Sequence, residues 1–76
     1  MAWILPRMRD VQIRGDMIRL GQLLKLAGVL DSGGDVKAVL TAGAVKVNGE
    51  PESRRGRQLH PGDLVEVDAE ALRVVS

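Results

Sequence analysis

The segment that most constrains the fold runs from residue 32 to residue 49, SGGDVKAVLTAGAVKVNG. It ends in Asn48-Gly49, the strongest short-range signal for a two-residue β-hairpin turn, because both turn residues need a positive φ. Just before this dipeptide, Val45 and Val47 alternate with Lys46, which is typical of a strand with one buried face. The sequence therefore predicts a strand that folds back on itself at Asn48-Gly49.

A short helix is predicted in the first half of the same segment. Ser32 can open it, because a serine oxygen accepts an unpaired backbone N–H group of the first turn. Val36, Val39 and Leu40 then recur on one side at helical spacing. Gly43 follows the last of them, where a left-handed C-cap suits glycine. Helix, stop, strand and turn thus follow one another within one short segment.

A leucine-rich helix is predicted before this segment, at residues 20 to 27. Its apolar residues follow the i, i+3, i+4, i+7 pattern of a buried helix face: Leu20, Leu23, Leu24 and Ala27. Gly28 ends it, whereas Arg19 is a poor N-cap and Gly21 costs stability in an early turn. Only a few residues join the two helices, so we expect them to pack at a tight corner.

Short strands are predicted in the rest of the chain, at residues 11 to 13, 64 to 68 and 72 to 75. Pro51 lacks a backbone N–H group, so the returning strand of the hairpin can only lie at a sheet edge. Residues 52 to 58 are expected to form a polar loop. The expected fold class is α+β, with two short helices and three to five strands.

The length of 76 residues predicts one domain, at residues 11 to 76, preceded by a flexible leader at residues 1 to 10. There is no cysteine, so a core drawn from 45% hydrophobic residues has to hold without disulfides. The short apolar run at residues 2 to 5 precedes the basic residues, unlike a signal peptide. No stretch is long enough to cross a bilayer. We therefore expect a cytoplasmic protein without a membrane partner.

Positive charge is concentrated in the middle of the chain, although the net charge is only +1. The cations of this region are Lys37, Lys46, Arg54, Arg55 and Arg57, and the charged residues after Pro61 are mostly acidic. A basic centre beside an acidic tail indicates one positive face for a polyanion. For an isolated RRGR cluster, a solvated surface without any partner is the simpler interpretation, so charge alone does not establish a binding face.

The residue types favour folded RNA over single strands as the polyanion. The chain has no Tyr or Phe, so it lacks the aromatic platforms on which unpaired bases stack. Folded RNA can instead be recognised through its phosphates and its shape. Lys25 and Lys37 lie on the predicted helices, and Lys46 points outward from the predicted strand. Ser32, Gly33 and Asn48 are neutral hydrogen-bonding partners close to these cations.

Catalysis and cofactor binding find little support. The single histidine, His60, lies in HPGD, a sequence typical of a turn, with no nucleophile at a recognisable spacing. One histidine among scattered carboxylates does not make a metal site. The N–H groups of Gly33 and Gly34 can contact a phosphate at the start of the helix, but no nucleotide-binding motif is present. We expect no metal, cofactor or small-molecule substrate.

Three blocks in this order resemble a known family: RLGQLLKLAG, SGGDVKAVLTAGAVKVNGE and RRGRQLHPGDLVEV. Together they resemble the RNA-binding domain of ribosomal protein S-four, also called the alpha-L motif, and most closely its small free-standing bacterial members. The resemblance covers about residues 18 to 67. It implies two helices packed at an angle against a small, strongly bent sheet, and a basic surface that docks on structured RNA.

The resemblance also implies which residues face the RNA: Lys25, Ser32, Gly33, Gly34, Lys37, Asn48, Arg54 and Arg55. Lys46 is added from strand alternation and Arg57 from the RRGR cluster. Many family members carry a serine–arginine pair where this chain has SGGD, and Asp35 suits the helix N-terminus as a charge favourable to the dipole. Larger relatives carry catalytic domains, for which this chain has no room.

The resulting hypothesis is a non-catalytic protein that binds structured RNA, with ribosomal RNA as the expected target and ribosome assembly as the process in which it would act. The ribosome or its assembly factors would then be further partners. The alternative is a small protein-interaction module, which would use the returning edge strand or the apolar corner at Val29-Leu30.

Overall fold

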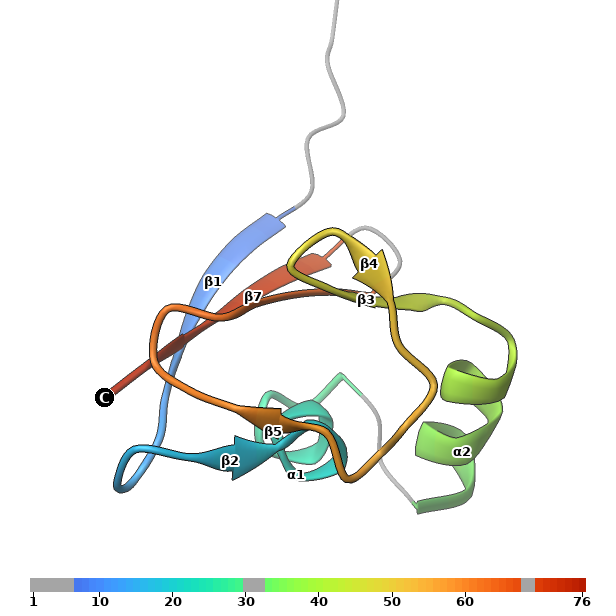
Figure 1. Cartoon of the computed structure of the whole chain (residues 1–76), viewed down its shortest axis with the longest axis horizontal. Helices are drawn as coiled ribbons and strands as arrows, with labels where there is room; N and C mark the ends of the chain where they lie inside the picture. The colour runs from blue at the N-terminus through green and yellow to red at the C-terminus, as the bar shows by residue number, and fades with distance from the viewer. Residues whose placement is uncertain (1–6, 30–32, 68–69) are drawn as a thin grey trace, which may run out of the picture.

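The computed structural model describes residues 7–29, 33–67 and 70–76 (Figure 1). The elements follow one another as β1 (Arg7–Gln12), β2 (Ile18–Arg19), α1 (Leu20–Leu26), α2 (Gly33–Thr41), β3 (Val45–Val47), β4 (Glu50–Pro51), β5 (Gln58–Leu59), β6 (Leu64–Val67) and β7 (Glu70–Val75). Neither helix in these ranges is long and apolar enough to cross a membrane.

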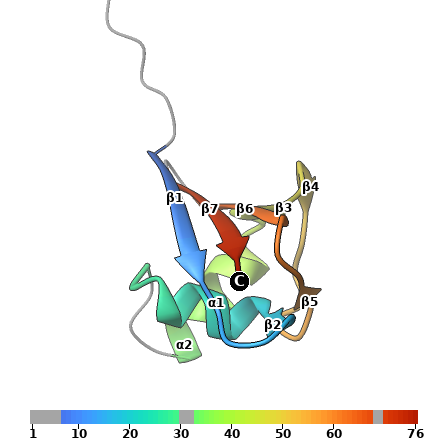
Figure 2. The same cartoon turned by 90° about the vertical axis from the view of Figure 1, so that its left-hand side faces the viewer.

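The molecule has two layers. A five-stranded sheet in the order β1-β7-β6-β3-β4 forms one layer, with β1 parallel to β7 and the other neighbours antiparallel. Helices α1 and α2 and the short β2–β5 ribbon form the other layer (Figures 1 and 2). This confirms the expected α+β class. The β2–β5 ribbon was not predicted, because two-residue strands are too short to show an alternation.

The hairpin predicted at Asn48-Gly49 is present. Both residues have positive φ, 52° and 87°, and Val47 pairs with Glu50 across the turn. Pro51 lies in β4, the edge strand of the sheet, where the sheet loses no backbone hydrogen bond through the missing N–H group of proline. This part of the chain adopts the structure that local sequence signals predict.

The core lies between the inner face of the sheet and the helices. The largest fully buried side chains are Leu20, Leu23, Leu24, Val36, Val45, Val47, Leu59, Val65, Val67, Leu72 and Val74. The apolar stripes predicted on both helices are therefore confirmed, with Leu40 also buried and Ala27 and Val39 partly buried against the core. Val29 packs partly against the same core, and Leu30 lies outside the described residues.

The expected leader of residues 1 to 10 is wrong in its second half. Residues 7 to 10 belong to β1, which pairs with β7 along its whole length, from Arg7 opposite Glu70 to Gln12 opposite Val75. Met8, Arg9 and Asp10 are all exposed, so the sequence shows no alternation of buried and exposed positions there, and only the partner strand far along the chain determines this part of β1. Residues 1 to 6, including Trp3, lie outside the described residues.

Candidate nucleic-acid interface

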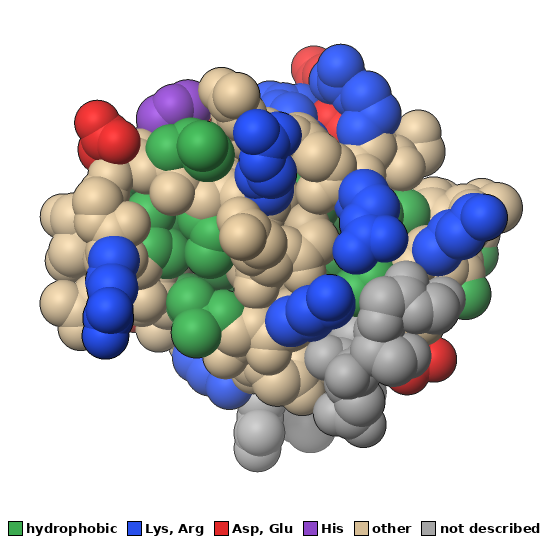
Figure 3. All heavy atoms as spheres, turned by 90° about the horizontal axis from the view of Figure 1, so that it is seen from below, with side chains coloured by type: hydrophobic (Ala, Val, Ile, Leu, Met, Phe, Trp, Pro, Cys, Tyr) green, Lys and Arg blue, Asp and Glu red, His purple; other side chains and the backbone are tan. Residues whose placement is uncertain are grey.

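Exposed or partly exposed cations gather on the layer formed by α1, α2 and the loop at residues 52–57. We call this surface the basic face and define it by Arg19, Lys25, Lys37, Arg54, Arg55 and Arg57. Figure 3 shows Lys and Arg side chains spread over the molecule as seen from this layer, with acidic side chains near the margins.

Arg19 was not predicted as a site residue. Its guanidinium donates to the Gly56 carbonyl over 3.3 Å, a contact without any local sequence signal.

The loop is held against the N-terminus of α1 by its own backbone. The Leu20 N–H group donates to the Arg57 carbonyl and the Gly21 N–H group donates to the Arg55 carbonyl, both over 2.9 Å. Helix N-termini leave such N–H groups without intrahelical partners, so the loop takes the place of a capping side chain. A Cβ atom on Gly21 would lie 3.4 Å from the Arg55 carbonyl oxygen. The glycine in an early turn thus allows the loop to approach closely.

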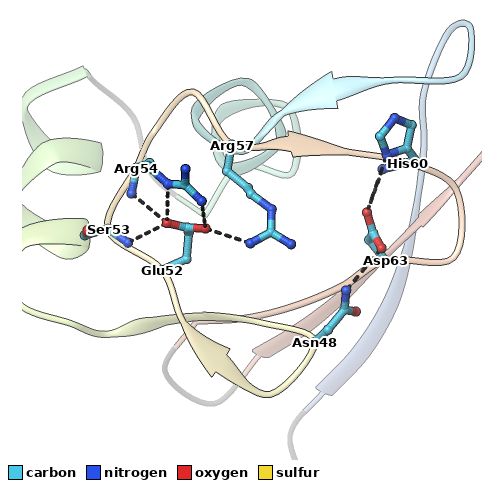
Figure 4. Close-up of polar contacts among 7 residues, drawn as sticks. All are labelled: Asn48, Glu52, Ser53, Arg54, Arg57, His60 and Asp63. Carbon is cyan, nitrogen blue, oxygen red and sulfur yellow. Dashed lines mark hydrogen bonds and ion pairs between the residues drawn. The ribbon is translucent and has the colours of Figure 1, made fainter.

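A buried carboxylate holds the side chains of this loop (Figure 4). The Glu52 side chain is only 7% exposed and accepts hydrogen bonds from both arginines: from Arg57 Nη1 over 2.7 Å and from Arg54 Nε over 3.1 Å. It also accepts the backbone N–H groups of Ser53 and Arg54, each over 3.1 Å. Glu52 was expected only as part of a polar loop. Sequence reasoning missed its role, because burial of a glutamate depends on partners that the fold supplies.

These contacts determine the protonation of Glu52. Hydrogen bonds from the side chains of Arg54 and then Arg57 lower the pKa of Glu52 from 4.5 to about 2, although burial alone would raise it. The carboxylate is therefore ionised throughout the physiological range, and the ion pairs persist there.

Acid should destabilise the wild-type protein more than a Glu52→Gln variant. Because the pKa of Glu52 in the folded state lies below its unfolded value, the carboxylate stabilises the fold above about pH 4.5, and this contribution is lost as the pH falls toward 2. Urea unfolding followed by circular dichroism at several pH values measures the free energy of unfolding. Other carboxylates contribute equally to both proteins, so equal pH dependence would contradict this role of Glu52.

Asn48 joins two turns of the molecule. Its Oδ1 accepts the Leu64 N–H group over 2.9 Å, and its Nδ2 donates to Asp63 over 3.1 Å. Asp63 in turn accepts the His60 N–H group over 2.7 Å, which closes the turn that the HPGD sequence predicts (Figure 4). Burial opposes ionisation of Asp63, but the bonds from His60 and Asn48 prevail and lower its pKa. The structure thus gives the Asn48 amide a role inside the fold.

Replacing Asn48 by alanine should therefore reduce stability. The variant leaves the Leu64 N–H group without its hydrogen-bond acceptor. It also places alanine at a φ of 52°, a conformation that asparagine tolerates better than alanine does. We expect the free energy of unfolding to fall by about 1–3 kcal/mol in urea titrations. Asn48→Gly, which relieves the backbone but also loses the amide, should lose less. Unchanged stability of Asn48→Ala would show that these bonds contribute nothing.

Lys46 lies apart from the basic face. It alternates with the buried Val45 and Val47, so its side chain projects from the outer face of the sheet, and its cross-strand neighbour is Glu66. Two other strands of the same sheet, β1 and β7, carry the ion pair between Asp10 and Arg73, which is 2.9 Å long. Positive charges on this outer face thus have acidic neighbours.

The other predicted site residues are placed as follows. Lys25 is exposed in the last turn of α1, and Lys37 is exposed on α2. Gly33 and Gly34 are the first residues of α2, and Ser32 lies outside the described residues. The structure therefore brings the helical lysines and the RRGR arginines to one layer, and separates Lys46 from them.

Comparison with known proteins agrees with this architecture. The family model of the S4 domain matches residues 11–75, so the chain belongs to the S4 domain family. The resemblance seen in the sequence is thereby confirmed. The chain is also 52% identical over 58 residues to the probable ribosome maturation protein RlbA of Bacillus subtilis (strain 168). That alignment covers 76% of this chain and 82% of the relative.

Proposed function

We propose that this chain is a non-catalytic RNA-binding protein that docks its basic face on structured RNA, and that its target is ribosomal RNA during ribosome maturation in the cytoplasm. The arrangement of the arginine loop, residues 52–57, carries the proposal: its backbone caps α1, the helix that carries Lys25, and its Gly56 carbonyl accepts a hydrogen bond from Arg19. The printed name of the relative, a probable ribosome maturation protein, supports the choice of target.

Recognition would rest on phosphates and RNA shape. Tyr and Phe are absent from the sequence, so the basic face offers no ring of these residues on which an unpaired base could stack. Arginine suits the task because its planar guanidinium can hold a phosphate at two positions. Such binding depends on the charge of the backbone more than on base sequence.

Affinity for structured RNA should fall steeply with salt. If about four or five phosphates are contacted, a plot of log K against log salt concentration should have a slope of about −3 to −4. Fluorescence anisotropy with refolded bacterial ribosomal RNA, between low and physiological salt, measures this slope. A slope near zero would contradict the proposal.

Crosslinking in cells, followed by sequencing of attached RNA, tests the target. Ribosomal RNA fragments are the expected result. Recovery of a protein partner without RNA would instead favour the interaction module, for which β4 at the sheet edge and the partly buried Val29 are the described surfaces.

A further inference from the structure

A groove of about 590 Å³ opens beside the arginine loop. Its lining residues are Arg54, Gly56, Arg57, Gln58 and His60, so two arginines and a histidine contribute to its wall and no acidic residue does. The His60 side chain is 59% exposed, and its Nδ1 lies 4.0 Å from Asp63. Such a lining suits an oxyanion with several acceptor oxygens.

The guanidinium groups keep donors for such a ligand. Each guanidinium has five N–H donors. Arg54 uses two nitrogens on Glu52, Nε and Nη2, and Arg57 uses Nη1. The remaining donors on both side chains make no further hydrogen bond among the described residues. Glu52 therefore fixes one edge of each guanidinium and leaves donors on the others.

We infer that this groove is a phosphate-binding site for structured RNA, and that Glu52 is its positioning residue, holding Arg54 and Arg57 in place before RNA arrives. The inference rests on the proposed function. Flexible arginines would lose conformational freedom when they bind RNA, whereas arginines already held by Glu52 lose little. His60, expected from the sequence only as a turn residue, becomes part of the site.

Charge alone and positioning predict opposite effects of removing the Glu52 carboxylate. If only charge mattered, Glu52→Gln would tighten RNA binding, because a negative charge near the phosphate disappears. If Glu52 positions the arginines, the same substitution weakens binding. The sign of the change therefore separates the two explanations.

The experiment compares Glu52→Gln with Glu50→Gln in anisotropy titrations of refolded bacterial ribosomal RNA. Glu50 is exposed in β4 of the same hairpin, so its substitution makes the same change of net charge outside the cluster. We expect Glu52→Gln to weaken binding by about tenfold and Glu50→Gln to leave it equal or slightly tighter. The slope against salt should also become shallower by about one for Glu52→Gln alone. A merely structural role would leave that slope unchanged.

A second variant keeps the test decisive if Glu52→Gln fails to fold, as judged by circular dichroism. Arg57→Lys retains the charge but loses the planar fork, and should weaken binding about fivefold. Arg73→Lys on the outer face of the sheet is its control and should have no effect. Wild-type affinity in Glu52→Gln, or in Arg57→Lys where Glu52→Gln does not fold, would overturn the inference while leaving the proposed function intact. Failure of the wild type to bind RNA at all would overturn the proposed function, and this inference with it.

Discussion

Replacing Arg54 and Arg55 together by glutamate should lower the affinity for refolded bacterial ribosomal RNA by about a hundredfold at physiological salt. Two cations of the basic face become anions, so phosphate contacts are lost and repulsion is added. Glutamate at position 54 would also lie beside the buried Glu52 carboxylate, which now accepts hydrogen bonds from Arg54. Anisotropy titrations of the folded variant measure the loss.

The matched control is Lys46→Glu with Arg73→Glu, which makes the same change of net charge on the outer face of the sheet. Electrostatic effects between exposed charges fade beyond about 8–10 Å at physiological salt. We therefore expect this variant to weaken binding only about threefold. Equal losses in the two double variants would mean that RNA binding responds to total charge and that the basic face is no separate site.

Replacing Leu59 by alanine should lower the free energy of unfolding by about 2–5 kcal/mol. Leu59 is 0% exposed and belongs to the central apolar cluster, so truncation leaves a cavity that the short β5 cannot fill. A chain of this size has a total stability of roughly 4–11 kcal/mol. The variant is therefore expected to be partly unfolded by mild warming.

Urea unfolding followed by circular dichroism measures this loss, and Leu26→Ala is its control. Leu26 lies at the end of α1 with 57% of its surface exposed, so its truncation should cost less than about 0.5 kcal/mol. Similar losses for both leucines would contradict the assignment of the core. Because Leu59 follows the arginine loop, its loss should also weaken RNA binding.

Local signals predicted much of the fold. The helices, the hairpin and the buried faces of β3 and β6 follow from periodicity and turn chemistry, which act between residues close in the chain. The early start of β1 and the β2–β5 ribbon could not be predicted this way. Each depends on a partner strand far along the chain, β7 for β1 and β5 for β2.

The candidate site shows the same division. The positively charged residues were recognisable from their types and their clustering in RRGR, and the family resemblance named most of them. From the sequence, Gly21 was expected only to reduce the stability of the helix. The structure shows that the Arg55 carbonyl of the loop lies close to it, where a side chain would crowd the loop. Asn48 was predicted to face RNA, whereas in the structure its side-chain amide makes hydrogen bonds to Asp63 and to the Leu64 backbone.

The sequence by itself determined the helix faces, the turn at Asn48-Gly49 and the presence of a basic cluster, because each depends on neighbouring residues. Only the tertiary structure decided which cations share a face, that Lys46 stands apart, and that Glu52 lies buried between Arg54 and Arg57. Burial and pairing of a charge depend on what the fold packs around it. A buried carboxylate is stable only where such partners replace water.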